Sequence, residues 1–375
     1  MSPLRRVLAG CDLCDLSRIA LIVFATSLSP ARLFAQESPL KPHPAVISSQ
    51  FIYEKAPYPQ CHASTIVESA PGHLSAAWFG GTRERNPDVC IYLAHLVDGK
   101  WSEGVQVADG VQVGADRLPT WNPVLFQAPR GGPLMLFYKV GPSPSAWWGM
   151  VKSSTDGGKT WGEATRLPDG ILGPIKNKPV TLESGAWLSP SSTEGKDGWQ
   201  VHFERSDDAG KTWRIVGPVK KGPALEAIQP SILIHNDGAL QALCRSKQGV
   251  VAQTWSKDGG KTWTPLTATE LPNPNSGTDA VTLADGRQMI VYNHSAHRID
   301  EAKGNRWPLD VAVSDDGLVW RRAVTLETEP NKAGYAYPAV IQASDGQVHI
   351  TYTWDRHRIK HVVVDPKKLL APKKL

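Results

Sequence analysis

The sequence contains little cysteine and no recognisable cofactor motif. Only five cysteines occur in 375 residues, and two of them, Cys11 and Cys14, lie in an N-terminal segment that we expect to be removed. The remaining three form an odd set without metal-ligand spacing, so they are interpreted as buried thiols. No dinucleotide-binding or phosphate-binding glycine pattern is present. We therefore expect neither a metal nor a cofactor.

Concentrated positive charge and long apolar runs are also missing. The net charge is only +5, and no basic cluster with interleaved aromatic residues stands out, so nucleic acid is not expected as a partner. The apolar run at residues 19–28 follows three arginines and precedes a small-residue exit near Ala35. It is too short to span a bilayer and is typical of a secretory signal. We expect residues 1–36 to be a signal peptide and residues 37–375 to be one domain, secreted or periplasmic, without membrane insertion.

Helical periodicity is absent, whereas a tryptophan-containing turn is repeated. The pattern S-x-D-x-G-x-T-W occurs at residues 154–161, 206–213 and 256–263, with a shorter copy at 314–320 and a worn one at 97–101. Asp and Ser side chains bond nearby backbone groups, Gly adopts the positive φ of the turn, and Trp buries a large ring. We interpret these aspartates as turn-forming groups and not as catalysts.

A second repeat runs between these turns and consists of an apolar strand, a turn with glycine and a return strand. Six copies begin near residues 63, 123, 179, 230, 280 and 339, a period of roughly 55 residues. A period of this length built from short strands predicts an all-β fold, a six-bladed β-propeller of four-stranded blades. The alternating segment 358–364 is expected to complete a blade together with residues near 51–53.

The residue that precedes each inner strand is expected to lie at the mouth of the central channel. This position is polar in every copy, and the set is His62, Asn122, Lys178, Gln229, Asp279 and Tyr337. Convergent polar side chains at one end of a channel predict a pocket for a polar ligand, although a water-filled mouth remains the alternative.

Arginines and one acid add to this mouth. Arg83 and Asp88 lie in the loop after the second strand of the first blade. Arg245 ends the second strand of the fourth blade, and Arg306 precedes the strand before the last tryptophan turn. The planar guanidinium fork binds both oxygens of a carboxylate, so these positions favour an acidic ligand.

The turns, the six repeats and these positions together resemble the sialidase (neuraminidase) superfamily over roughly residues 50–365. The resemblance implies that Asp88 is the acid/base and Tyr337 the nucleophile. It also implies that Arg83 belongs to the substrate site, and that Arg245 and Arg306 are two members of a carboxylate-binding arginine triad.

Two positions depart from the family pattern. His62 stands where the family has an Arg-Ile-Pro motif, and Gln229 stands where the family has the glutamate that activates the tyrosine. An amide cannot accept the phenolic proton, so Tyr337 would need another base. Asp279, Glu226 and His62 remain open as candidates for that base.

These features support three functional hypotheses. The first is a secreted, exo-acting glycoside hydrolase of the sialidase type, in which Asp88 protonates the leaving oxygen and Tyr337 attacks or stabilises the anomeric centre of a terminal acidic sugar. The second is a uronate-directed polysaccharide lyase or rhamnosidase-like enzyme with His62 as base or acid. The third is a non-catalytic carbohydrate-binding propeller. A carboxylated glycan is the expected partner in the first two.

Overall fold

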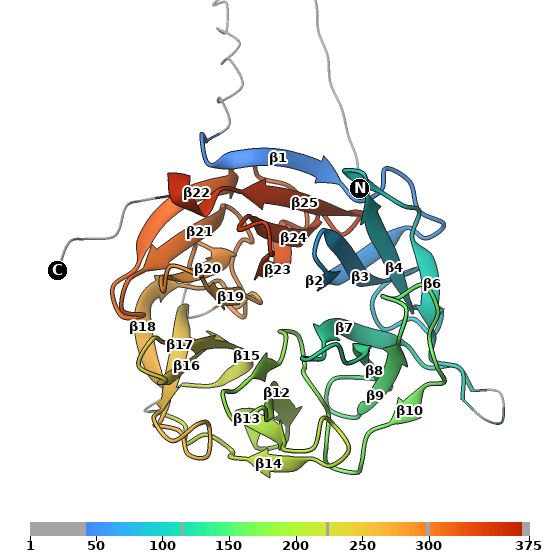
Figure 1. Cartoon of the computed structure of the whole chain (residues 1–375), viewed down its shortest axis with the longest axis horizontal. Helices are drawn as coiled ribbons and strands as arrows, with labels where there is room; N and C mark the ends of the chain where they lie inside the picture. The colour runs from blue at the N-terminus through green and yellow to red at the C-terminus, as the bar shows by residue number, and fades with distance from the viewer. Residues whose placement is uncertain (1–42, 113, 115, 223–224, 298–300, 370–375) are drawn as a thin grey trace, which may run out of the picture. The chain divides into compact units, whose positions relative to one another are not determined.

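The computed structural model describes residues 43–112, 114, 116–222, 225–297 and 301–369, so the expected signal peptide lies outside the described residues. Six antiparallel sheets stand around a central axis (Figure 1), which confirms the predicted all-β, six-bladed propeller. The single described helix is the short 3₁₀ turn η1 (Pro366–Lys368). Within the described ranges no helix is long and apolar enough to cross a membrane.

The blades follow one another along the chain, and each begins with its innermost strand. Blade 1 contains β2 (Gln60–Ala70), β3 (His73–Gly81), β4 (Cys90–Val97), β5 (Lys100–Trp101) and β6 (Val105–Ala108). Blade 2 contains β7 (Thr120–Gln127), β8 (Leu134–Val140), β9 (Trp148–Ser154) and β10 (Thr165–Arg166). Blade 3 contains β11 (Val180–Thr181), β12 (Trp187–Gly195), β13 (Gly198–Ser206) and β14 (Arg214–Val216). Blade 4 contains β15 (Ala227–Ile234), β16 (Leu240–Ser246), β17 (Val250–Ser256) and β18 (Thr267–Pro272). Blade 5 contains β19 (Asp279–Thr282), β20 (Gln288–Asn293), β21 (Leu309–Ser314) and β22 (Arg321–Glu327). Blade 6 contains β23 (Tyr335–Gln342), β24 (Val348–Trp354) and β25 (Arg358–Val364), with β1 (Val46–Phe51) as its fourth strand.

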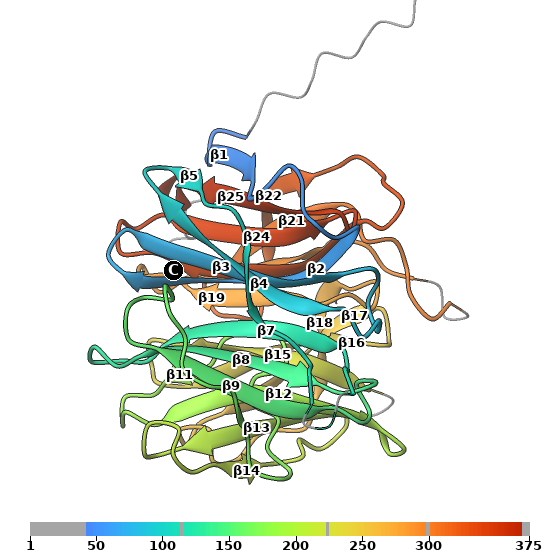
Figure 2. The same cartoon turned by 90° about the vertical axis from the view of Figure 1, so that its right-hand side faces the viewer.

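Both ends of the described chain close the ring in blade 6. Strand β1 pairs antiparallel with β25, with Phe51 opposite Lys360, and Figure 2 shows the two strands side by side. The expectation that residues 358–364 complete a blade with an N-terminal segment is therefore confirmed. The pairing strand begins at Val46, a few residues before the expected position.

The repeated aspartate turns adopt the geometry expected from their sequence. In the copy at 256–263, Asp258 accepts hydrogen bonds from the amide of Thr262 at 2.9 Å and from its hydroxyl at 2.6 Å. The equivalent bonds from Thr212 lower the pKa of Asp208 to about 2. Trp263 donates from its indole nitrogen to the carbonyl of Gly260, which anchors the turn to its own ring. These carboxylates are occupied by turn bonding, as predicted.

Apolar side chains fill the spaces between blades. One cluster joins Met289 and Val311 of blade 5 to Val340 and Ile350 of blade 6, all of them completely buried. The cysteines beyond residue 36 are free and buried, which confirms their expected role as packing groups. Each blade therefore buries its two faces against its neighbours, and this leaves only the ends of the propeller for loops and function.

A buried histidine pair in blade 6 makes the fold sensitive to acid. Trp101 donates to Nδ1 of His361 at 3.2 Å, and Nε2 of His361 lies 3.0 Å from Nδ1 of His349. Burial lowers the pKa of His361 to about 3 and also lowers the pKa of His349. The folded state therefore prefers both rings neutral, whereas an unfolded histidine takes up a proton near pH 6.5.

We expect stability that is complete above about pH 6.5 and falls as the pH decreases toward about 3, by up to about 1.4 kcal/mol per pH unit for His361. Urea unfolding between about pH 7 and about pH 4.5 measures the slope of the free energy of unfolding against pH. The substitution His361→Gln keeps an acceptor for Trp101, cannot titrate and should flatten the slope. The control His73→Gln changes an exposed imidazole and should leave the slope unchanged. An unaltered slope in His361→Gln would contradict this prediction.

Candidate functional site

A bulge on the inner strand aims side chains into the channel mouth. In blades 1, 2, 4 and 6, two residues of the inner strand oppose one residue of its neighbour. The first of the two has a positive φ in each case: Ala63 (56°), Asn122 (32°), Gln229 (57°) and Tyr337 (54°). A non-glycine residue in this conformation costs about 1–3 kcal/mol, and such strain is concentrated at functional sites.

The bulges show that the six predicted mouth residues do not all occupy equivalent positions in their blades. Asn122, Gln229 and Tyr337 are equivalent, but their counterpart in blade 1 is Ala63, and His62 lies one residue earlier, paired with Phe79. The blade 3 and blade 5 strands have no such bulge in their register. The pattern of polar residues before an apolar strand could not reveal this offset, because a bulge changes the phase of a strand without changing its composition.

The phenolic oxygen of Tyr337 is the point where several predicted residues meet. Gln229 donates from Nε2 to this oxygen at 3.1 Å, and Arg245 donates from Nη1 at 2.9 Å. The guanidinium carbon of Arg306 lies 5.8 Å from the centre of the Tyr337 ring. Both hydrogen-bonding partners donate to the phenolic oxygen, so neither accepts its proton in this arrangement.

His62 packs against the same ring, with 4.1 Å between ring centroids. Its Nδ1 is 3.0 Å from the hydroxyl of Thr353, and its Nε2 is buried without a hydrogen-bond partner among the described residues. Burial, followed by the positive charges of Arg356 and Arg306, holds the pKa of His62 well below its usual value. The imidazole is therefore neutral at physiological pH and resists protonation.

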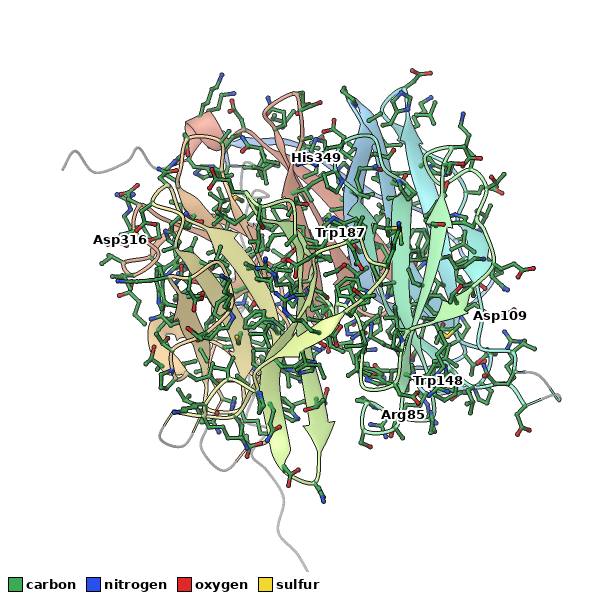
Figure 3. The ribbon with its side chains drawn as sticks, turned by 60° about the horizontal axis from the view of Figure 1, so that its bottom comes forward. Arg85, Asp109, Trp148, Trp187, Asp316 and His349 are labelled. Atoms are coloured by element: carbon green, nitrogen blue, oxygen red, sulfur yellow. The ribbon has the colours of Figure 1, made fainter. Side chains whose placement is uncertain are left out.

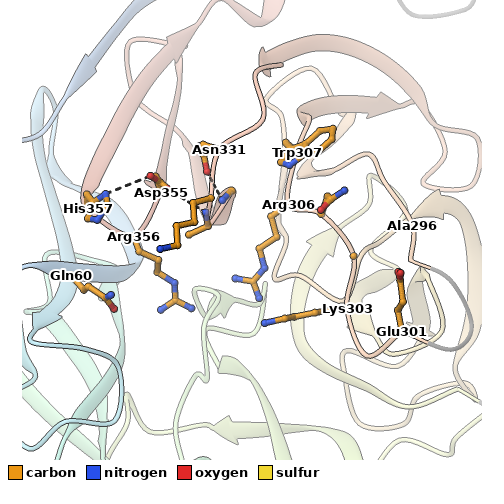
Figure 4. Close-up of a pocket in the computed structure, with 15 residues that line it drawn as sticks. Gln60, Ala296, Glu301, Lys303, Arg306, Trp307, Asn331, Asp355, Arg356 and His357 are labelled. Atoms are coloured by element: carbon orange, nitrogen blue, oxygen red, sulfur yellow. Dashed lines mark hydrogen bonds and ion pairs between the residues drawn. The ribbon is translucent and has the colours of Figure 1, made fainter. Parts of the chain in front are cut away.

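A third guanidinium comes from the turn between β24 and β25. Asp355 and Arg356 both have positive φ there, 48° and 62°, and the backbone carbonyl of Arg356 accepts a hydrogen bond from the amide of Cys61 at 2.7 Å. Arg356 thus lies beside the segment that carries His62. Figure 4 shows Arg306 and Arg356 pointing into the same space. Burial and the nearby charge of Arg245 lower the pKa of Arg306 to about 10, which reflects this concentration of positive charge.

Sequence reasoning did not single out Arg356, although the repeat contained a signal for it. The second strand of every blade returns toward the mouth, since Tyr335 at the start of β23 pairs with Trp354 at the end of β24. A charged residue in the turn that follows must therefore lie near the channel opening. The same topology places the loop after β3, which carries Glu84 and Asp88, on this side of the molecule.

The loop between β3 and β4 brings a different residue to the cluster than expected. Glu84 forms an ion pair with Arg356, with 2.5 Å between Oε2 and Nη1. The side chain of Arg83 is exposed and makes no hydrogen bond or ion pair with the described residues. Asp88 is exposed and accepts hydrogen bonds at 2.8 Å from both the amide and the hydroxyl of Thr82, which fix the shape of the loop. Figure 3 shows Arg85 of this loop and Trp148 toward one end, away from Asp316 and His349.

Two predicted mouth residues bind each other. Lys178 lies 3.1 Å from Asp279 in a largely buried ion pair. Asp279 also accepts hydrogen bonds from the hydroxyl of Ser231 at 2.8 Å and from the amide of Val340 at 2.9 Å. The carboxylate therefore ties blades 3, 4, 5 and 6 together across the channel. We therefore assign Lys178 and Asp279 to the channel wall and not to the substrate site. Asp279 is then no longer a candidate for the base that activates Tyr337.

The third candidate base is also occupied. Glu226 pairs with Lys247 at 2.7 Å and accepts a hydrogen bond from the amide of Trp199 at 3.0 Å. Glu194 is a carboxyl that sequence reasoning missed, and it lies closer to the arginines. Burial raises the pKa of Glu194, and the positive charge of Arg245 opposes this rise. Glu194 sits at the end of β12, in the hairpin whose Trp199 ring faces Arg245 at 5.1 Å.

Lys176 is a further functional candidate that the sequence did not distinguish from a loop residue. Its Nζ lies 5.7 Å from the centre of the Tyr337 ring and donates to the carbonyls of Pro338 at 2.6 Å and Thr278 at 3.0 Å. Burial lowers the pKa of Lys176 to about 7. The carbonyl contacts hold the backbone of the Tyr337 bulge in place.

The arrangement combines a positively charged wall with a phenolic oxygen. Arg245 of blade 4 donates to the oxygen of Tyr337, and Arg306 of blade 5 lies over its ring. Arg356 of blade 6 lines one pocket together with Arg306 and adds its charge near His62, which packs on the same ring. Among the residues that the structure describes, no group of three or more His, Cys, Asp or Glu side chains is placed to hold a metal ion. Such a site can bind an anion and offer the phenolic oxygen to an electrophilic carbon beside it.

Comparisons with known proteins agree with this picture at the level of the family. Residues 72–350 match the model of the BNR repeat-like domain. An anhydrosialidase of Macrobdella decora is 22% identical over 207 residues, which cover 50% of this chain and 26% of that protein. A sialidase of Micromonospora viridifaciens is 25% identical over 209 residues, which cover 53% of this chain and 27% of that protein. The chain thus matches about a quarter of the length of these relatives.

Solved structures share the fold at low sequence identity. A Dyadobacter fermentans protein of unknown function superposes with a TM-score of 0.71 at 17% identity, covering 86% of this chain and 99% of that one. A Streptococcus pneumoniae sialidase gives 0.68 at 12% identity, covering 86% and 71%. The intramolecular trans-sialidase of Ruminococcus gnavus gives 0.65 at 14% identity, covering 88% and 99%. With the matched repeat domain spanning most of the propeller, the chain belongs to the BNR repeat-like family and is a sialidase-like six-bladed β-propeller.

Proposed function

We propose that the protein is an exo-acting glycoside hydrolase of the sialidase type that releases a terminal acidic sugar from glycans. The observation that carries this proposal is the contact of Arg245 and Arg306 with Tyr337, with Arg356 beside Arg306 as a third guanidinium. Guanidinium groups bind carboxylates through two parallel hydrogen bonds, and a partly buried site strengthens them. A sugar whose carboxylate is held here presents its anomeric carbon to the phenolic oxygen.

In the proposed reaction the terminal glycosidic bond is broken and water is added. Asp88 donates a proton to the leaving oxygen as the glycosidic bond breaks, while Tyr337 stabilises the positive charge at the anomeric carbon or attacks that carbon and releases its phenolic proton to water. Water then adds to the anomeric carbon, breaks the bond to Tyr337 where one has formed, and gives up a proton to the Asp88 carboxylate. The substrate carboxylate lies beside this carbon and offsets the charge of the oxocarbenium-like transition state. The loop of Asp88 also carries Glu84, whose ion pair with Arg356 occupies the anion site until a substrate carboxylate replaces it.

Gln229 provides a direct test of the role of Tyr337. The substitution Gln229→Glu would place a carboxylate oxygen about where Nε2 now lies, 3.1 Å from the phenolic oxygen and near Arg245, which can balance the new charge. Because a carboxylate accepts the phenolic proton, we expect kcat to rise by about tenfold or more. Steady-state kinetics on the released sugar measures this change.

The matched control for this substitution is Asn122→Asp, which introduces an acid at the equivalent bulge of blade 2. It should not raise kcat, because no hydrogen bond among the described residues joins Asn122 to Tyr337. An unchanged or lower kcat in a stably folded Gln229→Glu protein would argue against a reaction limited by the missing base.

The activity itself is tested with purified residues 37–375 and a panel of sialosides and uronate-capped glycans. Products are analysed by mass, with ultraviolet absorbance recorded in parallel. Release of a free acidic monosaccharide supports the hydrolase. Binding of panel glycans without any product would instead identify a carbohydrate-binding propeller and contradict the proposed catalysis.

His62 supports a second candidate, a lyase or rhamnosidase-like enzyme acting at a uronate. Its neutral imidazole packs against the ring of Tyr337, and its buried Nε2 lacks a hydrogen-bond partner among the described residues. A lyase leaves an unsaturated product that absorbs in the ultraviolet, whereas a hydrolase does not. The same panel therefore separates the two reactions.

We further propose that the protein acts outside the cytoplasm, on the basis of the arginines and apolar run before residue 36. The N-terminal sequence of the protein recovered from its native host tests this proposal. A mature chain that begins near residue 37 supports export, and an intact Met1 contradicts it.

A further inference from the structure

A cavity adjoins the arginine cluster on the side of blades 5 and 6. It has a volume of about 640 Å³ and lies between the β20–β21 loop, the β22–β23 loop and the β24–β25 turn (Figure 4). We call it the blade 5–6 pocket. Arg306 and Arg356 form the wall that it shares with the Tyr337 site, and neither Tyr337 nor Arg245 lines it. Its size is within the range of sites that bind small molecules.

The lining of the blade 5–6 pocket carries an excess of positive charge. Lys303 and Lys332 line it in addition to Arg306 and Arg356. Both lysines are exposed, and neither makes a hydrogen bond or ion pair with the described residues. Figure 4 shows Lys303, Arg306 and Arg356 pointing toward a common space. Positive charges that face one another across an open cavity raise the local concentration of anions.

Two carboxylates also line the pocket, and their positions limit how much of this charge they offset. Asp355 accepts a hydrogen bond from the amide of Ala333 at 2.7 Å and lies 3.6 Å from His357, so it holds the turn together. Glu301 is exposed. Arg356 is already paired with Glu84, so the positive charge that remains comes from Lys303, Lys332 and Arg306. These three cations face Glu301 and Asp355, and Asp355 is engaged by the backbone of the pocket itself.

We propose that the blade 5–6 pocket is a second anion subsite, which binds a carboxylate or sulfate on the sugar unit next to the one held at Tyr337. This inference rests on the proposed function, because it takes the terminal acidic sugar to lie among Arg245, Arg306 and Arg356. The shared wall of Arg306 and Arg356 lets one glycan place an acidic group on each side of it. The preferred substrates are then glycans with two adjacent acidic units.

The test measures binding by calorimetry in a Tyr337→Phe background, so that no probe is turned over. The probes are the methyl glycoside of N-acetylneuraminic acid, a dimer of two linked N-acetylneuraminic acids, and a disaccharide with one uronate and one sulfate. The pair Lys303→Gln and Lys332→Gln is compared with the control pair Lys211→Gln and Lys261→Gln, which changes exposed lysines of the aspartate turns.

We expect the dimer to bind more tightly than the monomeric glycoside. The pocket variant should lose about tenfold in affinity for the dimer and little for the monomer, as expected for two partly exposed ion pairs. The loss should shrink as salt is raised, and the control pair should behave as the parent does. An equal loss with the sulfated probe assigns the subsite to anions in general, and a loss confined to the dimer assigns it to carboxylates.

Two outcomes overturn the inference: a dimer that binds no more tightly than the monomer, and a pocket variant that binds the dimer as well as the control pair does. These outcomes are distinct from a failure of the proposed function. If the wild-type protein releases no acidic sugar but its dimer binding depends on the two lysines, the catalytic proposal is wrong and the subsite stands. If it releases the sugar and the two lysines have no effect on dimer binding, the subsite is wrong and the catalytic proposal stands.

Discussion

Replacing Tyr337 with phenylalanine is expected to lower kcat by about 10²- to 10⁴-fold, the range seen when a group that acts directly in the chemical step is removed. The change deletes only the phenolic oxygen, on which Gln229 and Arg245 converge, and keeps the ring that packs against His62. Substrate binding through the arginines should be retained. Steady-state kinetics on a substrate found in the glycan panel measures the effect.

The control for this experiment is Tyr335→Phe, two residues earlier on β23. The hydroxyl of Tyr335 donates to the carbonyl of Glu329 at 2.7 Å, away from the arginine cluster. Its loss should reduce stability slightly and leave kcat near the wild-type value. If Tyr337→Phe retains kcat within about twofold, the phenolic oxygen takes no part in the rate-limiting chemistry and the proposed mechanism fails.

Replacing Arg356 with lysine is expected to lower kcat/KM by about 10²-fold on a carboxylated substrate, mainly through KM. Lysine keeps the positive charge but loses the planar fork that binds two oxygens at once. Removing a hydrogen-bonded partner from a partly buried charge pair costs about 2–5 kcal/mol, which corresponds to this range. A loss of this size would support direct contact between the Arg356 guanidinium and the substrate carboxylate.

The matched control is Arg358→Lys, at the first residue of β25, directly after the β24–β25 turn. Arg358 pairs with Glu54 and stacks on Phe51, and it does not line the blade 5–6 pocket. Its replacement should leave KM unchanged. Equal kinetic losses in the two variants would show that the connection as a whole was disturbed, and would contradict a specific role for the Arg356 guanidinium.

The fold could be predicted because the aspartate turns and the strand pairs recur with one period. Each aspartate turn marks the same corner of a blade, and Asp258 and Asp208 indeed hold their turns by the expected bonds. Because the repeat places equivalent residues at equivalent points of each blade, it also indicates which residues face the channel. The meeting of Gln229, Arg245 and Tyr337 at one oxygen follows from that repeat, although these residues are far apart in the sequence.

The remaining features of the site depend on contacts that a repeat phase does not determine. The pairing of Lys178 with Asp279 crosses the channel between blades, so neither residue's own strand reveals it. The ion pair of Glu84 with Arg356 joins the two ends of the propeller ring, 272 residues apart in sequence. His62 lies one position before the bulge, because the phase of the inner strand is set by backbone conformation at Ala63.

The central claim is that the arginine cluster holds a substrate carboxylate beside Tyr337. It is tested most directly with two forms of one glycoside that differ only in this group, the free acid and its methyl ester. The account predicts that the purified protein cleaves the acid at least about 10²-fold faster in kcat/KM, and that Arg356→Lys reduces this preference. Equal cleavage of acid and ester, with no effect of Arg356→Lys on their ratio, would contradict the claim.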